Sequence, residues 1–219
     1  MSSANPDPDP ASLPARTASK VPASKRGART RTALIDAARV LFERDGYMET
    51  RINDIPDAAG VAVGTFYTYF DSKEEILAAV LESVSDAMIY PHLDHVGDPT
   101  DMRALIKANN RAYLLAYREN ANLMRLFEQL AQVDPQFREL RRKRAREFAR
   151  RSARTISRLQ EQHRADADID PYYAALALGG MVGRMAHTVY VDGERVAFEA
   201  LLTTVTDLWV NALRIDEPR

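Results

Sequence analysis

The basic side chains best suited to bind an anion gather in residues 137–159. Ten Lys or Arg residues stand there against Glu139 and Glu147, a local balance of +8. Most of this run is typical of a solvated helix face, but at about 100° per residue Arg141 and Arg144 fall within the apolar stripe. A buried guanidinium requires an anionic partner. Either neighbouring carboxylates pair with these two arginines, or the arginines hold the acidic group of a ligand.

A second set of small and polar residues, at positions 63–69, suits contact with a nucleic acid. Gly64 lets another backbone approach closely, and the hydroxyls of Thr65, Tyr67 and Tyr69 can bond phosphates or base edges. The alternative is that the two tyrosines are packing aromatics and that Thr65 is an ordinary helical residue.

Metal and catalytic chemistry find little support in the sequence. His92 and His95 lie beside Asp94 and Asp98 in an expected loop, which is a weak pattern for a metal site. His187 shares an apolar helix face, and no Ser, Asp or Glu partner is placed beside it, so a core or pocket role is favoured over that of a base. We expect no enzyme activity, no cofactor and no bound metal.

The composition excludes several classes of protein. The 219 residues carry 30 Lys and Arg against 31 Asp and Glu, a formal charge of −1, which excludes a uniformly basic coat. The absence of cysteine excludes disulfides and Cys-based metal sites. No apolar run approaches the roughly 18 residues of a membrane span, and the N-terminus lacks the apolar core of a signal peptide. We expect a cytoplasmic protein without a membrane partner.

Helical periodicity dominates the chain after a proline-rich tail. Residues 1–24 hold five of the 11 prolines, which predicts a disordered segment. Beyond it, apolar residues recur at spacings of three and four, which predicts an all-α fold. Gly46 and Gly60 end helices, and Asp or Asp-Pro starts others. The expected helices, about nine, cover residues 30–45, 53–59, 63–70, 73–90, 101–118, 121–132, 135–160, 171–191 and 195–214.

Two short helices joined by a tight turn at Gly60, after a longer helix, form a helix-turn-helix pattern. Across residues 33–81 the chain resembles the tetracycline-repressor (TetR) family of bacterial transcriptional regulators. The resemblance implies an N-terminal three-helix DNA-binding domain, residues 25–73, and a larger C-terminal helical domain for ligand binding and dimerisation, residues 74–219. The matching residues, in chain order, are Ala37-Ala38, Leu41-Phe42, Gly46-Tyr47, Thr50, Asp54-Ile55, Ala59-Gly60-Val61, Gly64-Thr65-Phe66-Tyr67, Tyr69-Phe70 and Ser72-Lys73-Glu74-Glu75-Ile76-Leu77.

The resemblance also implies which residues contact DNA. The second short helix would lie in the major groove, with Tyr67 and Lys73 as phosphate anchors. Two positions depart from the family pattern: Arg51 replaces Thr or Ser, and Pro56 replaces Ala, which a helix accepts only in its first turn. The expected DNA contacts are Arg29, Thr50, Arg51, Asn53, Val63, Gly64, Thr65, Tyr67, Thr68, Tyr69 and Lys73.

Charge in this domain depends on placement more than on its total. Residues 25–73 carry eight basic and seven acidic side chains, a balance of only +1. Lys25, Arg26, Arg29 and Arg31 lie together where the tail ends. They either follow DNA phosphates or enter a minor groove, or they are an ordinary solvated helix start.

The C-terminal domain offers residues for a ligand pocket. Methionines and aromatic side chains would surround the apolar part of a small-molecule inducer, and the basic helix would hold an acidic part. An acyl thioester of coenzyme A would suit both. The expected ligand-binding residues are Tyr113, Tyr117, Met124, Phe127, Arg141, Arg144, Phe148, Met181 and His187.

The last two helices carry the pattern of a helix–helix interface. The final one has an apolar three-four repeat, and glycines in the preceding one let a facing helix approach closely. By resemblance, two chains would form a four-helix dimer interface, and the alternative is an intrachain core. The expected interface residues are Gly179, Gly183, Phe198, Leu201, Val205, Leu208, Trp209 and Ala212.

Together these inferences predict a homodimeric transcriptional regulator, a repressor that binds double-stranded operator DNA and is released by a small molecule. The rival hypothesis is a ligand-binding or enzymatic helical bundle with a vestigial helix-turn-helix.

Overall fold

The computed structural model describes residues 22, 24–89 and 101–215. Within these residues it contains nine helices and no strand, which confirms the all-α prediction. Apart from Pro22 and Ser24, the expected tail at residues 1–24 lies outside the described residues, and so does the His and Asp group at 92–98. The helices are α1 (Lys25–Arg44), α2 (Asp54–Ala58), α3 (Val63–Tyr69), α4 (Lys73–Ile89), α5 (Met102–Glu119), α6 (Ala121–Val133), α7 (Pro135–Glu161), α8 (Pro171–Tyr190) and α9 (Phe198–Ala212).

Capping side chains determine where most of the longer helices begin. The Ser24 Oγ accepts the Gly27 amide at 3.1 Å, so α1 begins at Lys25, earlier than the expected Thr30. Asp101, Asp134 and Asp170 cap α5, α7 and α8 as predicted. The helix α9 has no side-chain cap and begins at Phe198, later than the expected position 195.

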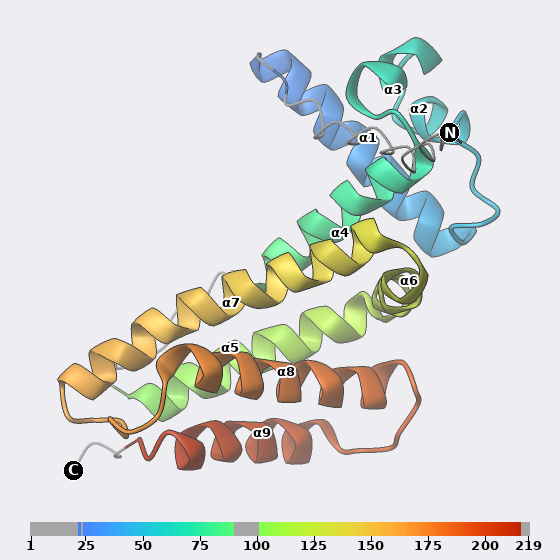
Figure 1. Cartoon of the computed structure of the whole chain (residues 1–219). Coiled ribbons are helices and arrows are strands. Elements are labelled where there is room, and N and C mark those ends of the chain that lie inside the picture. Colours follow the sequence, from blue (N-terminus) through green and yellow to red (C-terminus); the bar gives the residue numbers. More distant parts are fainter. Residues whose placement is uncertain (1–21, 23, 90–100, 216–219) are drawn as a thin grey trace, which may run out of the picture.

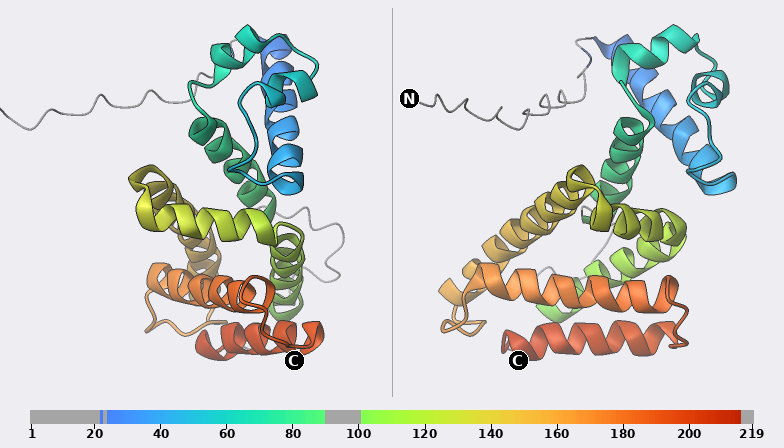
Figure 2. Two further views of the ribbon diagram at one scale, coloured as in Figure 1. Left: turned by 90° about the vertical axis from the view of Figure 1, so that its right-hand side faces the viewer. Right: turned by 45° about the vertical axis from the view of Figure 1, so that its right-hand side comes forward.

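The helices form a small head and a larger body joined by α4 (Figure 1). The head consists of α1, α2 and α3. The helix α4 packs against α1 at its head end and extends into the body, where it packs against α5 and α7. Within the body, α7 packs most extensively against α8, and α5 against α9. The helices α8 and α9 lie side by side at the end of the body farthest from the head in each view of Figure 2. No helix in the described ranges has the length and apolar content needed to span a bilayer.

Two phenylalanines form the centre of the head core. Phe66 and Phe70 are fully buried, with ring centroids 5.8 Å apart. Gly60 has a φ of +67°, a left-handed conformation that favours glycine and redirects the chain from α2 to α3. Pro56 is the third residue of α2, within the first turn, where the missing amide costs no helical hydrogen bond.

Most of the residues predicted for a dimer interface pack within the chain, as the intrachain alternative has it, and the dimer interface stays a prediction. A Cβ at Gly179 would overlap the Phe148 ring, and one at Gly183 would lie 3.2 Å from the Tyr113 hydroxyl. These glycines therefore let α7 and α5 approach α8. On α9, the residues of the apolar repeat that α5 and the rest of the body bury are Leu201, Val205 and Trp209, with Phe198 partly buried.

Two residues of that predicted interface remain outside the core. Leu208 is 45% exposed, and Ala212 is also exposed. A single apolar repeat on α9 thus contains both core and surface positions, because the helix buries a wide stripe against α5.

Candidate nucleic-acid interface and body interior

The outer face of α3 presents most of the residues expected to read DNA. Val63, Gly64, Tyr67 and Thr68 are exposed, and a Cβ at Gly64 would meet no atom within 4 Å. The Tyr67 ring rests edge-on against Phe66, with centroids 5.3 Å apart. The helix therefore combines a fixed inner aromatic with an outer surface of small and hydroxyl-bearing side chains.

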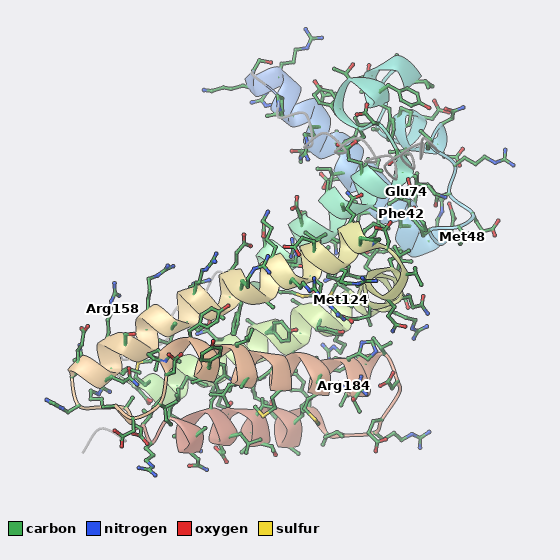
Figure 3. All side chains as sticks on the ribbon, in the orientation of Figure 1. Phe42, Met48, Glu74, Met124, Arg158 and Arg184 are labelled. Atoms are coloured by element: carbon green, nitrogen blue, oxygen red, sulfur yellow. The ribbon has the colours of Figure 1, made fainter. Side chains whose placement is uncertain are left out.

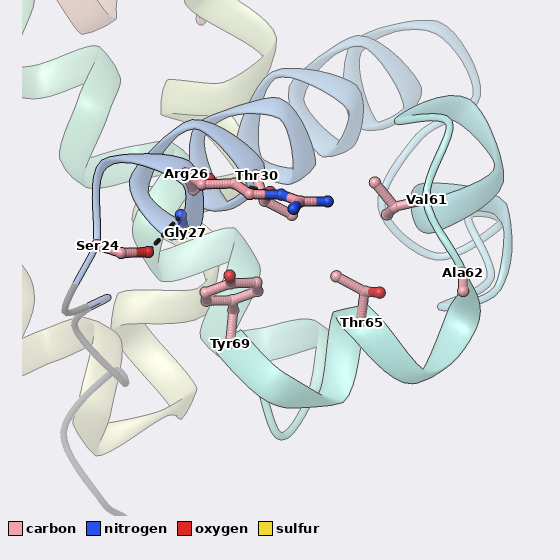
Figure 4. Close-up of a pocket in the computed structure, with 8 residues that line it drawn as sticks. All are labelled: Ser24, Arg26, Gly27, Thr30, Val61, Ala62, Thr65 and Tyr69. Atoms are coloured by element: carbon pink, nitrogen blue, oxygen red, sulfur yellow. Dashed lines mark hydrogen bonds between the residues drawn. The ribbon is translucent and has the colours of Figure 1, made fainter.

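Thr65 and Tyr69 face the start of α1 across an open groove of about 450 Å³ (Figure 4). The α1 side of the groove adds the Arg26 guanidinium and the first turn of the helix, where Ser24 caps the Gly27 amide and the helix dipole carries partial positive charge. The sequence pattern missed this pairing of α1 with α3, and the signal that could have found it is Ser24, a capping residue three positions before Gly27. The lining residues are Ser24, Arg26, Gly27, Thr30, Val61, Ala62, Thr65 and Tyr69.

Lys73 and Thr50 have inward-facing roles that do not support the expected phosphate contacts. The Lys73 Nζ donates to the carbonyls of Tyr47 at 2.8 Å, Thr50 at 3.0 Å and Met48 at 3.4 Å. The ammonium also lies 4.4 Å from the centroid of the Tyr47 ring. The Thr50 hydroxyl is buried and donates to the Gly46 carbonyl at 2.8 Å. Both side chains hold the loop between α1 and α2 in place.

The remaining expected contacts, Arg29, Arg51 and Asn53, are exposed on the head. The Arg51 amide donates to the Asp54 carboxylate at 2.9 Å, which fixes the backbone before α2. Asn53 precedes α2 without a side-chain capping bond. The side chains of Arg29, Arg51 and Asn53 thus lie on the surface, and the contacts between these residues and DNA stay a prediction.

A cluster of aromatic and polar side chains occupies the body between α5 and α8. The ring centroids of Tyr113 and Tyr117 are 5.9 Å apart, and those of Tyr117 and Tyr190 are 6.5 Å apart. The Tyr117 hydroxyl lies 3.1 Å from His187 Nδ1, and His187 Nε2 lies 3.5 Å from the Asp192 carboxylate. Burial raises the pKa of both the Tyr113 and the Tyr117 phenols, so both stay protonated at neutral pH.

The other expected pocket residues divide between this cluster and the general core. Phe148 joins it from α7 and meets Trp209 edge-on at 6.4 Å between centroids. Met181 is partly buried on α8. Met124 and Phe127 are buried in the core of the body from α6. The structure thus brings aromatic side chains of α5 and α7 together along the glycine face of α8.

The two arginines predicted in the apolar stripe differ in environment. Arg141 lies on the surface and forms a 2.7 Å ion pair with Glu128, which is the carboxylate alternative and corrects its placement in a pocket. Arg144 is 8% exposed, and its Nη2 lies 3.9 Å from the Asp86 carboxylate, beyond hydrogen-bond distance. Its Nε and Nη1 are buried without a hydrogen-bond partner. Burial lowers the pKa of the Arg144 guanidinium, whereas Asp86 raises it.

One polar contact between head and body was not predicted from the sequence. The Arg39 Nη2 of α1 donates to the Asn120 Oδ1 at 2.8 Å, and Asn120 is the residue between α5 and α6. The backbone amide of Asn120 in turn donates to the backbone carbonyl of Tyr117 at 3.2 Å. A hydrogen-bonded connection therefore runs from the aromatic cluster of the body to α1.

Comparison with known proteins places the head in one family. The family model of bacterial regulatory proteins, tetR family, matches residues 34–80. The chain is 37% identical over 78 residues to the HTH-type transcriptional repressor KstR2 of Rhodococcus jostii, an alignment that covers 36% of this chain and 38% of KstR2. It is 23% identical over 203 residues to the HTH-type transcriptional regulator EthR of Mycolicibacterium smegmatis, covering 89% of this chain and 93% of EthR.

Solved structures share the whole arrangement of head and body. The fatty acid degradation regulator FadR from Bacillus halodurans superposes with a TM-score of 0.67 at 20% identity, covering 85% of this chain and 97% of FadR. SmeT, the repressor of the Stenotrophomonas maltophilia multidrug efflux pump SmeDEF, superposes with a TM-score of 0.63 at 23% identity, covering 84% and 89%. The head thus matches the model of bacterial regulatory proteins, tetR family, over residues 34–80, and the whole chain shares its fold with the solved structures of FadR and SmeT.

Proposed function

We propose that the chain is a homodimeric repressor that binds operator DNA through α3 and releases it when a small molecule occupies the body. The observation that carries the proposal is the exposed face of α3, with Gly64, Tyr67 and Thr68, beside the groove at the start of α1. A helix of this kind enters a major groove, and a helix N-terminus next to it is suited to a phosphate. The functional division is a DNA-binding domain at residues 25–73 and a sensing domain at 74–219.

The phosphate-binding part of this surface is the groove lined by α1 and α3, in place of the side chains of Lys73 and Thr50. Arg26 and the helix dipole at the start of α1 supply positive charge, and the hydroxyls of Thr65 and Tyr69 supply hydrogen bonds. Base edges then meet Val63, Gly64 and Tyr67, with Arg29, Arg51 and Asn53 along the flanking backbone.

The homodimer uses the outward face of α8 and α9. Tyr173 is 69% exposed and Leu208 is 45% exposed, and Ala177 and Gly180 lie exposed on the same face of α8 as Tyr173. Large apolar side chains beside small ones suit close helix packing between two copies. A two-fold dimer also presents two α3 helices to paired half-sites.

The effector is a lipid-like molecule with an acceptor-bearing group, such as an acyl-CoA. The aromatic cluster around Tyr117 and Phe148 suits an apolar chain, and the Nε and Nη1 of Arg144 offer buried donors without acceptors. FadR of B. halodurans, which shares the fold, is named for fatty acid degradation. Arg141 takes no part in this site because Glu128 holds it at the surface.

The DNA-binding part is tested by fluorescence anisotropy with the duplex upstream of the chain's own gene and a scrambled duplex of equal length. Wild type binds the upstream duplex selectively, and Tyr67→Ala loses at least tenfold in that selectivity. Thr155→Ala, an exposed change on α7, is the matched control and retains it. Wild type that binds neither duplex would favour a ligand-binding bundle with a vestigial helix-turn-helix.

The effector part is tested with decanoyl-CoA, with free coenzyme A and decanoate as controls. Decanoyl-CoA releases wild type from DNA, and Arg144→Gln requires at least tenfold more for the same release. Arg141→Gln responds as wild type does, since its side chain lies on the surface. Equal release of all three proteins rejects the role of Arg144, and no release of wild type rejects the acyl-CoA class. Native mass spectrometry of ligand that copurifies with the protein would then identify the effector.

A further inference from the structure

Five arginines recur at every fourth position of α7 and form a surface that the proposed function does not use. We call this surface the arginine ladder. Four of its members are exposed, and the side chain of Arg146 is 40% exposed. At about 1.5 Å per residue, the ladder extends roughly 24 Å along the helix. Its members are Arg142, Arg146, Arg150, Arg154 and Arg158.

The ladder winds around α7 by about 40° at each step of four residues, so its last three members, Arg150, Arg154 and Arg158, lie within about 80° of one another. The packed residues of α7 also repeat every four positions, as Leu140, Arg144 and Phe148 show, and Ile156 continues the row two steps later. A ladder residue lies two positions after each packed one, which is about 200° around the helix. Figure 3 shows Arg158 on the side of α7 that faces away from α8 and α9.

Four of the five ladder arginines form no ion pair with a described carboxylate. Three other basic side chains of α7 have carboxylate neighbours, because Arg141, Lys143 and Arg144 lie within 4.0 Å of Glu128, Glu82 and Asp86. Within the ladder only Arg146 pairs with an acidic residue of the described chain, namely Glu139. Like charges four residues apart repel each other and weaken a helix. A surface that carries this repulsion from Arg150 to Arg158 is suited to an extended polyanion.

The chemistry of α7 favours DNA over a lipid surface as that polyanion. A cationic helix that binds a membrane also inserts large apolar side chains, and no such side chain of α7 is exposed in the described structure. Duplex DNA presents about one negative charge per 1.7 Å of its axis, so a stretch as long as the ladder carries more than enough phosphates for five arginines. A small ligand would span only a part of it.

We propose that the arginine ladder binds the backbone of double-stranded DNA without regard to sequence. The proposal rests on the proposed function in taking DNA as the partner of this chain. The head has a charge balance of only +1 over residues 25–73, so it reads DNA with little general attraction. The ladder supplies that attraction, and it holds a duplex segment separate from the half-site bound by α3.

The test compares two triple variants that remove the same charge from different places. One is Arg150→Gln, Arg154→Gln and Arg158→Gln in the ladder. The control is Arg125→Gln, Arg195→Gln and Arg214→Gln, at exposed positions elsewhere on the body. Binding of a scrambled duplex is measured by anisotropy between 50 and 200 mM salt, about the range over which phosphate contacts dominate salt dependence.

The ladder variant is expected to lose at least tenfold in affinity for the scrambled duplex. Its slope of log affinity against log salt should fall by about 2.7, which is roughly 0.9 for each of three lost phosphate contacts. The control variant keeps the wild-type slope. Replacing the three ladder arginines by lysine keeps the charge and restores most of the affinity.

Three results would overturn the proposal: an unchanged slope, equal losses in both triple variants, or loss of binding only to phosphatidylserine vesicles. A failure of the proposed function looks different. If wild type fails to prefer the upstream duplex but the ladder variant still loses scrambled-duplex binding, the ladder stands and operator recognition falls. If Tyr67→Ala loses selectivity while the ladder variant matches wild type, operator recognition stands and the ladder proposal falls.

Discussion

The head and the body bring their helices together by different means. In the head, Gly60 adopts a left-handed conformation at the turn between α2 and α3. The Lys73 ammonium donates to the carbonyls of Tyr47 and Thr50 in the loop between α1 and α2. In the body, Gly179 is helical and acts through its missing side chain, because the Phe148 ring fills that space. The head therefore depends on the backbone conformation of a short segment, whereas the body depends on contacts between helices far apart in the sequence.

Removing the Lys73 ammonium should cause the largest loss of stability. Lys73→Met keeps the length of the side chain but leaves the carbonyls of Tyr47 and Thr50 without their donor. A charged hydrogen bond contributes about 1.5–3 kcal/mol, so we expect a loss of about 3 kcal/mol for the group, measured by urea unfolding. Lys107→Met, at an exposed position of α5, is the control and changes stability little. Unchanged stability with lost DNA binding would restore Lys73 as a phosphate anchor.

Adding a methyl group at Gly179 tests the helix packing of the body, whereas the change at Lys73 removes a group from the head. Gly179→Ala adds a methyl group where the Phe148 ring already lies, so we expect a loss of about 1–3 kcal/mol from overpacking. The same change in an open helix would be stabilising. Combining it with Phe148→Leu removes the ring and should recover part of the loss in a double-mutant cycle. Strict additivity of the two changes would contradict the contact.

The sequence predicted the head better than the body because the constraints of the head are local. The turn at Gly60, the place of Pro56 in the first turn and the caps Asp134 and Asp170 each depend on residues a few positions apart. The resemblance to a family gave the positions of the head residues but not the direction of each side chain. The motif at Lys73 therefore marked a phosphate anchor, although the ammonium lies on loop carbonyls.

The body was predicted less well because one sequence pattern fits several partners. The apolar repeat of α9 is equally suited to packing within the chain and to a second copy, and Leu201 and Trp209 are buried within the chain, Trp209 beside Phe148 of α7. Likewise, Arg141 and Arg144 have similar positions on the helical wheel. Arg141 lies at the surface, where it pairs with the Glu128 carboxylate of α6, whereas Arg144 is buried where α7 meets α4. The packing partner of α9 and the environments of Arg141 and Arg144 thus depend on residues far away in the sequence.

Substitution of Gly60 should destabilise the head without disturbing the body. An alanine at a φ of +67° costs about 1–2 kcal/mol, because its Cβ crowds the next carbonyl. Asparagine tolerates this conformation better, so Gly60→Asn should lose less than Gly60→Ala. The measurement is amide hydrogen exchange, which should rise in α2 and α3 and stay at the wild-type rate in α8. Equal loss of protection in α2, α3 and α8 would show that head and body unfold as one unit.

The smallest effects are expected from removing one hydroxyl in each region. Tyr117→Phe loses the contact with His187 Nδ1 at 3.1 Å and should cost about 1 kcal/mol of stability, with DNA affinity retained in the absence of effector. Tyr67→Phe keeps the ring against Phe66 at an exposed position, so stability should change by less than about 0.5 kcal/mol. Its affinity for the upstream duplex should fall roughly fivefold, the equivalent of one hydrogen bond of about 1 kcal/mol. Paired urea unfolding and anisotropy separate the two variants. If Tyr117→Phe lost DNA affinity as well, the contact between Tyr117 and His187 would couple the body to the head even without effector.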